Sequence, residues 1–313
     1  MIRYVLRRLV MLGPVAVGIT MAVFLLVRLI PGDPARTLLG IHATPTLVAA
    51  MRAHLGLDRP LYVQYVIFVR HLAVGDFGHS YYYGQAISRL VLDHLGPTLM
   101  LLAYGTVLTL IIALPAGLLA AARRDQVADH LVRIGAVVGV GLPSYWIGFM
   151  LILFFAVMIP IFPVAGYGNG LPSHLFDLFL PALTIAVNIS PLVLRALRAS
   201  LMEALASGYI DTARAKGLPR RVVLLGHALP NAIVPAVTVL GLNIGYLVGS
   251  TVIVETVFAV PGLGQLMINS IGTRDYPVIQ AVTLVLGVLV VLVNLLTDLM
   301  QLLLDPRVRR EVT

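Results

Sequence analysis

The sequence contains no cysteine and only one lysine among its 22 basic residues. Without cysteine, the chain can form neither a disulfide nor a thiolate metal site. A P-loop needs a lysine followed by Ser or Thr, whereas Lys216 is followed by Gly217, so no Walker-type nucleotide site is present. The sequence also lacks an HExxH zinc motif, a GxSxG nucleophile elbow and any i, i+4 pair among its eight histidines. We expect no catalytic, metal or cofactor site in this chain. A hydrolase built from scattered residues is the alternative.

Charge is scarce, while apolar residues are abundant. Hydrophobic residues make up 59% of the 313 positions and charged residues only 12%, which is more apolar surface than a soluble core of this size can hide. The chain is therefore predicted to be an all-α integral membrane protein. The net charge of +8 would also suit a nucleic-acid partner. The positions of the basic residues explain this charge through membrane topology instead, so we expect no nucleic-acid binding.

Six apolar segments are long enough to cross a bilayer, because a helix of roughly 20 residues spans the hydrocarbon core. The predicted spans are residues 9–30, 98–122, 134–160, 178–194, 232–254 and 278–304. The first is too long for the apolar part of a typical signal peptide, and no small-x-small cleavage site follows it. Arg and Lys number fifteen on the side of both termini and six on the other side. The positive-inside rule therefore places both termini in the cytoplasm.

These spans divide the chain into four parts. Residues 1–30 hold the N-terminal segment and the first span, and residues 31–97 form a small helical extracytoplasmic subdomain. Residues 98–304 form the membrane core, which contains a cytoplasmic loop at 195–231, and residues 305–313 form a cytoplasmic tail. The aromatic cluster 81–83 is interpreted as part of an interfacial belt, with a ligand-binding aromatic box as the alternative.

The polar, basic stretch 209–230 stands between two long apolar runs and has the pattern helix, glycine turn, helix. Ser207 can cap the first helix, and Gly217 suits the left-handed position that follows it. Pro219 suits the first turn of the second helix. The apolar residues that fall on one face of this second helix are Val222, Leu225 and Leu229. This arrangement predicts a docking element, and an ordinary solvated loop is the alternative.

Few polar side chains fall inside the spans. At about 1.5 Å per helical residue, Asn188 and Asn243 both lie near the bilayer midplane. Glu255 lies near the outer end of the fifth span, and Asn294 and Asp298 share one face of the sixth. Such groups usually face a water path, although hydrogen bonding between helices without a substrate role is an equally ordinary use.

Three glycines, Gly241, Gly245 and Gly249, form a GxxxGxxxG pattern in the fifth span. A face of this kind allows another helix to approach closely. The pattern fits either a moving surface, for a gate or a second subunit, or static packing.

The 209–230 stretch resembles the coupling loop of bacterial ABC importer membrane subunits. That loop has an acid, two small residues, a glycine four positions later and a Leu-Pro, which here are Asp211, Thr212, Ala213, Gly217 and 229–230. The segment DTARAKGL is similar to the dipeptide/oligopeptide/nickel branch. Further motifs of that branch occur in order, namely RYVLRRL, IPGDP, HLGLDRP, GDFGHS, VETVFAVPGLG, RDYPVIQ, NLLTD and DPRVR. They fit the first of the two membrane subunits. Two departures are Pro230, where the branch usually has Arg, and 259–260, where it usually has Ser-Trp.

The resemblance implies a type I ABC importer permease fold in the bacterial inner (plasma) membrane, and a transport subunit rather than an enzyme. The implied partners are a paralogous second permease, two cytoplasmic ATPases or one fused ATPase, an extracytoplasmic substrate-binding lipoprotein and the lipid bilayer. ATP and Mg²⁺ would be used by the ATPases. The implied substrate is a small peptide, with nickel or a haem-like cofactor as alternatives. A stand-alone proton-driven carrier is a rival, but it predicts an inverted repeat with paired carboxylates, which the sequence does not show.

The resemblance and the patterns within the spans together assign residues to roles. The residues expected to contact an ATPase are Tyr209, Asp211, Thr212, Ala213, Arg214, Lys216, Gly217, Leu229 and Pro230. The residues expected to border the path or its gate are Asn188, Asn243, Glu255, Pro261, Gly262 and Gly264. The residues expected to pack helices together are Gly241, Gly245, Gly249, Asn294 and Asp298.

Overall fold

The computed structural model describes residues 13–25, 34–39, 43–54 and 56–304, and over these residues it is helical apart from loops and one β-bridge. An apolar helix, Gly13–Leu25, comes first. The remaining helices are α2 (Pro34–Leu39), α3 (Pro45–His54), α4 (Leu61–Ala73), α5 (Ile87–Ala122), α6 (Val127–Gly141), α7 (Ser144–Ile152), η2 (Leu153–Met158), α8 (Leu171–Asp177), α9 (Phe179–Leu205), α10 (Gly208–Ala215), α11 (Arg220–Val222), η3 (Val223–Ala228), α12 (Leu229–Val257), α13 (Leu263–Thr273) and α14 (Tyr276–Leu304). Those written η are π-helices.

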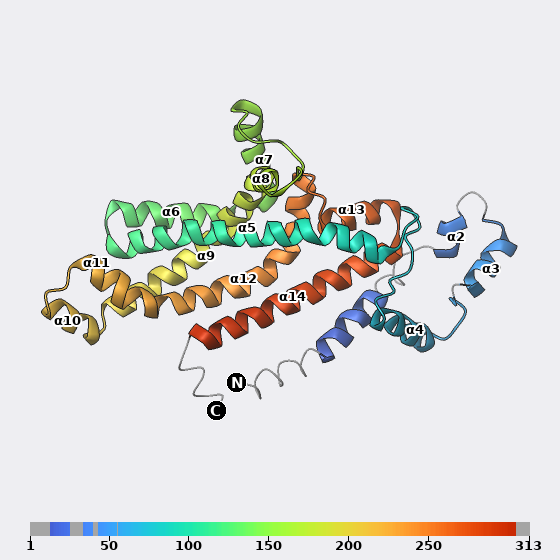
Figure 1. Cartoon of the computed structure of the whole chain (residues 1–313), viewed down its shortest axis with the longest axis horizontal. Helices are drawn as coiled ribbons and strands as arrows, with labels where there is room; N and C mark the ends of the chain where they lie inside the picture. Colours follow the sequence, from blue (N-terminus) through green and yellow to red (C-terminus); the bar gives the residue numbers. More distant parts are fainter. Residues whose placement is uncertain (1–12, 26–33, 40–42, 55, 305–313) are drawn as a thin grey trace.

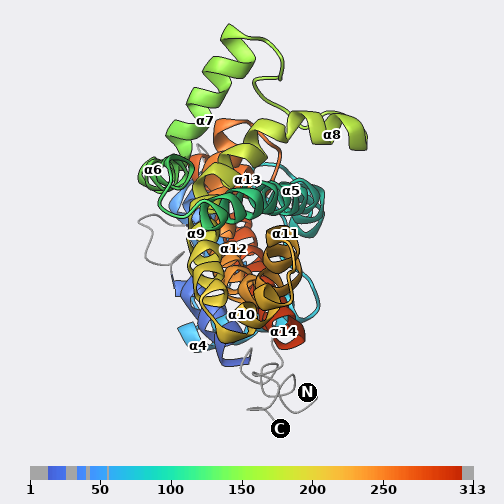
Figure 2. The ribbon, with the colours of Figure 1, turned by 90° about the vertical axis from the view of Figure 1, so that its left-hand side faces the viewer.

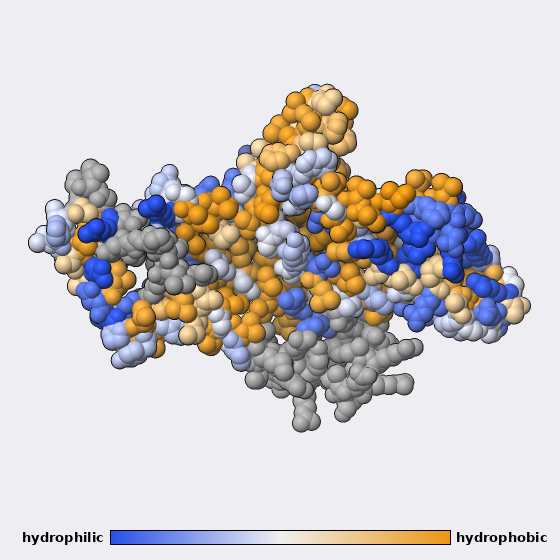
Figure 3. Space-filling view, turned by 180° about the vertical axis from the view of Figure 1, so that it is seen from behind, coloured by the Kyte–Doolittle hydropathy of each residue, from blue (hydrophilic) through white to orange (hydrophobic). Residues whose placement is uncertain are grey.

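The long helices α5, α9, α12 and α14 run along one axis of an elongated molecule (Figure 1). Helices α10 and α11 lie at one end of this axis, and α2 to α4 lie at the other. Hydrophobic surface covers the middle of the molecule, and hydrophilic surface gathers at its two ends (Figure 3). This distribution is the one a membrane-spanning bundle requires, because the hydrocarbon core offers no partner for polar groups.

Four continuous helices are long and apolar enough to cross a membrane: Ile87–Ala122, Phe179–Leu205, Arg220–Val257 and Tyr276–Met300. They correspond to the second, fourth, fifth and sixth predicted spans. The first predicted span, 9–30, is described only from Gly13 to Leu25, and its other residues lie outside the described part of the chain. Ile19 of this helix packs on α14, where a Cβ added to Gly287 would lie 3.0 Å from its side chain.

Helix α5 begins at Ile87, well before the expected start at residue 98. The residues before position 98 were assigned to the extracytoplasmic subdomain. In the structure, Arg89 and Asp93 are exposed on one side of this helix, while Ile87 and Leu90 are buried on the other.

The third predicted span, 134–160, is not one helix. Helix α6 ends at Gly141, and the α7–η2 segment leaves it at an angle of 105°. Pro143 is the reason, because a proline holds the residue before it in an extended conformation, as Leu142 adopts with ψ 132°. Helix α7 consequently projects away from the bundle (Figures 1 and 2).

The second helix of the 209–230 stretch is continuous with the fifth span. Helices α11, η3 and α12 form one 38-residue helical run from Arg220 to Val257. The predicted fifth span, 232–254, is therefore only the membrane part of a longer rod. A displacement at Arg220 passes directly into that span.

Helix α9 is the centre of the bundle and packs on α5, α6, α7 and α12. Small residues on its neighbours allow this close approach. A Cβ at Gly105 of α5 would lie 2.7 Å from Ile185, and one at Gly117 would lie 2.9 Å from Leu197. Helix α12 packs on α9 and also on α14, and it lies near the centre of the end-on view (Figure 2).

Candidate functional site

The turn at Gly217 has the geometry that the sequence predicts. Gly217 has φ 76°, in the left-handed region where glycine carries no Cβ penalty. Its amide donates to Arg214 O at 2.9 Å, and the Leu218 amide donates to Ala213 O at 3.4 Å. These two bonds are the pair of a Schellman motif, which ends helix α10 and reverses the chain toward α11.

The residues at the ends of α10 and α11 differ from the capping roles that the sequence predicts. Ser207 occupies the N-cap position of α10, but its hydroxyl donates to Ala204 O at 2.5 Å and caps no amide of the helix. Lys216 is the C-cap of α10, and Pro219 is the N-cap of α11 rather than a residue of its first turn. The helix–glycine–helix shape is stabilised instead by the two hydrogen bonds at the Gly217 turn and by the packing of α10 on η3.

Only part of the 209–230 stretch is available to a partner. Ile210 and Ala213 of α10 are buried against Val223 and Ala228 of η3, so Ala213 faces its own chain rather than a partner. Leu229 is also partly buried against the core. The predicted contact residues that are exposed are Tyr209, Asp211, Thr212, Arg214, Lys216, Gly217 and Pro230. On the second helix, Val222 and Leu225 are exposed and add apolar surface.

Two hydrogen bonds attach this segment to the bundle. Asn231 Nδ2 donates to the Tyr209 hydroxyl at 3.2 Å, which joins α10 to the start of α12. The guanidinium of Arg220 donates to the carbonyl of Ala122, which joins α11 to the end of α5. The segment is therefore connected to two different spans.

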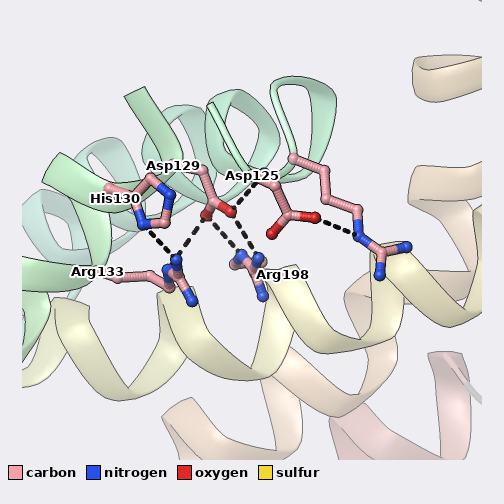
Figure 4. A network of polar contacts seen from close by, with 6 residues as sticks. Asp125, Asp129, His130, Arg133 and Arg198 are labelled. Atoms are coloured by element: carbon pink, nitrogen blue, oxygen red, sulfur yellow. Dashed lines mark hydrogen bonds and ion pairs between the residues drawn. The ribbon is translucent and has the colours of Figure 1, made fainter. Parts of the chain in front are cut away.

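A buried ion pair that sequence reasoning missed lies next to this end of the bundle (Figure 4). The guanidinium of Arg198 (α9) donates two hydrogen bonds to the carboxylate of Asp129 (α6), Nε to Oδ1 at 2.8 Å and Nη2 to Oδ2 at 2.7 Å. The Asp129 side chain is fully buried and also accepts from the Asp125 amide at 3.0 Å. Arg133 stands 3.8 Å from its other oxygen. In the sequence analysis Arg198 entered only the count of basic residues, because no local pattern pairs positions 129 and 198.

Glu255 caps a helix inside the described part of the bundle. It is fully buried, and its Oε2 accepts from the amides of Gly264 at 2.6 Å and Gln265 at 3.1 Å, at the N-terminus of α13. Its Oε1 accepts from the Thr98 hydroxyl at 2.7 Å, and Thr98 in turn accepts from the Leu263 amide. A carboxylate suits this position because a helix N-terminus carries free amides and partial positive charge.

The glycines of the same motif make room for this carboxylate. A Cβ at Gly262 would overlap the Glu255 carboxyl group, and a Cβ at Gly264 would overlap the Val252 backbone. Pro261 is exposed in the turn before them. The expected gate residues at this end are therefore parts of the joint between α12, α13 and α5.

Replacing Glu255 by alanine should destabilise the protein by about 3 kcal/mol, since charge-assisted hydrogen bonds contribute roughly 1.5–3 kcal/mol each and buried amides would be left unpaired. Glutamine should cost less, because its amide oxygen still accepts from α13. Thermal stability of the purified protein in detergent measures both. Alanine and wild-type proteins of equal stability would contradict this role.

The two asparagines predicted to lie near the bilayer midplane both form hydrogen bonds to backbone carbonyls. Asn188 Nδ2 donates to Leu142 O at 3.3 Å, so it satisfies a carbonyl freed at the bend after α6. Asn243 Nδ2 donates to Val239 O of its own helix at 2.7 Å. The Asn188 bond fits hydrogen bonding between separate segments, whereas the Asn243 bond lies within α12 and joins no second helix.

The three glycines of α12 do not share one role. A Cβ at Gly241 would overlap Thr297 of α14, and one at Gly245 would lie 3.0 Å from Asn294 Oδ1. These two glycines and Asn294 therefore pack α12 on α14. Gly249 has no atom of the described chain within 4 Å of its would-be Cβ. Asp298 lies partly buried on α14.

At the α2–α4 end, two motifs far apart in sequence meet. Asp275 accepts from the Ser80 hydroxyl at 2.5 Å and from the Tyr82 amide at 3.1 Å, which ties the turn 79–84 to the start of α14. Burial raises the pKa of the Tyr81 hydroxyl, and the Asp275 carboxylate adds to this shift. No group of three potential metal ligands occurs among the residues that the structure describes.

Comparison with known proteins agrees with this geometry. The family described as "Binding-protein-dependent transport system inner membrane component" matches residues 113–310, and its N-terminal companion matches residues 1–103. The chain is 40% identical to the probable peptide ABC transporter permease protein y4tP of Sinorhizobium fredii, covering 98% of this chain and 99% of that one. It is 37% identical to the glutathione transport system permease protein GsiC of Salmonella paratyphi A, over 99% of both.

Further similarities follow the same pattern. The probable D,D-dipeptide transport system permease protein DdpB of Escherichia coli is 40% identical, over 95% of this chain and 94% of that one. An inward-facing structure of the MetNI methionine ABC transporter has a chain with a TM-score of 0.57 at 22% identity, covering 69% of this chain and 96% of that one. The structural match supports the fold. The sequence matches show that this chain belongs to the family of inner-membrane permease subunits of binding-protein-dependent ABC transporters.

Proposed function

We propose that this chain forms one half of the translocation path for small peptides in an ATP-driven importer. An ATPase subunit pushes on the 209–230 segment and thereby moves the membrane helices. The observation that carries the proposal is the continuous helical run from Arg220 to Val257. A push on α10 and the Gly217 turn therefore moves a membrane helix without an intervening flexible loop. The exposed face of α10 supplies the surface on which an ATPase can push.

Each end of the molecule is assigned a different partner. The α10 end, which carries most of the basic residues, faces the cytoplasm. There, one of two ATPase subunits, or one half of a fused ATPase, holds the 209–230 segment. The α2–α4 end faces outward and receives peptide from a substrate-binding lipoprotein. A paralogous permease completes the path in the bacterial plasma membrane. The helix Gly13–Leu25 and the bent α6–α7 pair complete six spans with both termini inside.

The proposed mechanism uses helix movement alone in this chain. ATP and Mg²⁺ bind to the partner ATPases, whose closure draws the 209–230 segments of the two permeases together. Each α11–α12 rod transmits this movement to the bundle. The attachment of Arg220 to Ala122 carries part of it to α5 as well. The spans then rock between inward and outward openings.

Peptides are the proposed substrate because relatives of 37–40% identity over nearly the whole chain are named for peptides, glutathione and D,D-dipeptides. Nickel or a haem-like cofactor carried by the same machinery is the alternative substrate, and a stand-alone proton-driven carrier is the alternative mechanism.

Reconstitution of the complete complex in proteoliposomes tests the proposal. Labelled dipeptide and glutathione should be taken up only with the binding lipoprotein and ATP, and a P-loop lysine variant of the ATPase should abolish uptake. Uptake driven by a proton gradient without ATP would support the carrier. Uptake of nickel or haem but of neither peptide would overturn the substrate assignment.

A further inference from the structure

Helix α12 has one side that no part of the described chain covers. Its exposed residues between Leu242 and Thr256 follow the spacing of a single helix face, 4, 3, 4 and 3 residues apart. They are Leu242, Tyr246, Gly249, Ile253 and Thr256, and they are called the α12 stripe below. The rest of α12 packs on α5, α7, α9, α13 and α14.

The α12 stripe differs from the exposed faces of α5 and α6. The exposed residues of α5 between positions 99 and 119 are Leu99, Ala103, Val107, Ile111, Ile112, Pro115 and Leu119. On α6, after Arg133, they are Ile134, Gly135, Val137, Val138, Val140 and Gly141. These surfaces carry no hydroxyl, amide or charged side chain, as contact with lipid requires. The α12 stripe carries two hydroxyl groups instead.

Tyr246 is the decisive residue of the stripe. It is 69% exposed and lies about 16 Å from the end of α12 at Val257, which is near the middle of a 30 Å hydrocarbon core. No group of the described chain hydrogen-bonds its hydroxyl. Tyrosines that face lipid gather at the two interfaces, where the hydroxyl reaches water. A free hydroxyl at mid-depth therefore points to water rather than to acyl chains.

Gly249 lies on the same face as Tyr246. Unlike Gly241 and Gly245, it has open space around its would-be Cβ, so it does not serve close packing on α14. It lies one turn from Tyr246 toward the outer end, where a larger side chain would add bulk beside the tyrosine. The edge of the stripe is formed by Asn294, which touches Gly245.

We infer that the α12 stripe lines the aqueous path, and that Tyr246 and Gly249 limit the size of the peptide that passes. This inference rests on the proposed function. The stripe carries no charged residue, so it sorts peptides by bulk rather than by charge. A phenol hydroxyl both donates and accepts, and therefore matches the carbonyls and amides of any peptide backbone. The stripe belongs to the helical run that begins at Arg220 and includes Asn231, the partner of Tyr209 of α10, so movement of the coupling segment is carried along α12 to this wall.

Cysteine labelling tests the position of the stripe. Since the chain has no native cysteine, single cysteines at Tyr246, Leu242 and Gly249 can be compared with one at Val107, on the apolar face of α5. The assembled complex in proteoliposomes is treated with a charged, water-soluble methanethiosulfonate, and modification of this chain is measured by mass. The stripe cysteines should react much faster than the one at Val107.

Equally slow reaction at all four positions, in complexes that still couple ATP hydrolysis to uptake, would overturn the inference and leave the proposed function intact. It would mean that lipid or the second permease covers the stripe. Failure of the wild-type complex to couple ATP to peptide uptake would instead contradict the proposed function itself.

Size selection is tested by Gly249→Leu, with Gly135→Leu on α6 as the matched control, because both glycines are exposed and have open space around them. The probes are alanine peptides of two to five residues. Gly249→Leu should lower uptake of the pentapeptide relative to the dipeptide by about tenfold, the scale of steric discrimination in a binding pocket. Gly135→Leu should leave the ratio unchanged. The same loss for all lengths, or for both variants, would contradict a size limit at Gly249.

Discussion

Replacing Gly217 by valine is expected to reduce ATP-driven uptake by at least about tenfold, because a left-handed backbone costs a non-glycine residue roughly 1–3 kcal/mol. Gly217 has φ 76°, and its amide and that of Leu218 close the end of α10. A β-branched residue there would straighten the turn and rotate α10 away from α11. Three quantities measure the result: yield of the complex, ATPase rate and peptide uptake.

Asparagine at position 217 is the matched control, since it tolerates the left-handed conformation better than any β-branched residue. Gly217→Asn should retain most of the uptake of the wild-type complex. The space around Gly217 is open, so steric overlap within the chain does not contribute to the difference between the two variants. Full uptake and normal complex yield in Gly217→Val would show that the turn geometry does not matter for coupling.

Replacing Arg198 by alanine is expected to destabilise the protein by about 3 kcal/mol, the low end of the cost of leaving one partner of a buried ion pair uncompensated. The low end applies because the Arg198 side chain is 20% exposed, whereas that of Asp129 is fully buried. Arg133, at 3.8 Å, would only partly replace it. The pair joins the first turn of α6 to α9.

Two controls isolate the pair. Arg198→Lys keeps the charge but loses the bidentate hydrogen bonding, so the stability of this variant should lie between those of the wild type and Arg198→Ala. Arg124→Ala removes the exposed pair with Asp125, whose side chains are 66% and 69% exposed, and should change stability by less than about 1 kcal/mol. Thermal stability of each variant in detergent decides between them. Equal stability of Arg198→Ala and Arg124→Ala would contradict a structural role for the buried pair.

Local sequence patterns predicted elements whose cause is also local. The Gly217 turn was predicted because a left-handed position favours glycine. The last span was predicted as 278–304 and is observed as Tyr276–Leu304, because its apolar run is unbroken. The bend at Pro143 was missed for the same reason: the residues on both sides of it are apolar, so hydropathy shows no boundary there.

Contacts between distant residues could not be predicted from one sequence. Asp129 and Arg198 each look like ordinary cytoplasmic charges, and only packing of α6 on α9 makes them a buried pair. Glu255 was expected to border the path because it is a carboxylate inside a span. The capping of α13, which requires the chain to turn back at 258–262, explains it instead. The α12 stripe was likewise invisible, because exposure depends on which sides of α12 the other helices cover.

The central claim is that an ATPase subunit holds the exposed face of α10 and moves it. A single cysteine at Arg214, which is exposed on that face, tests this claim most directly in the assembled complex. With a short thiol-reactive cross-linker, it should join this chain to one ATPase subunit in high yield, and the cross-linked complex should lose ATP-driven uptake. A cysteine at Arg214 that reacts freely with water-soluble reagents and forms no cross-link to the ATPase, in a complex that still transports, would contradict the claim.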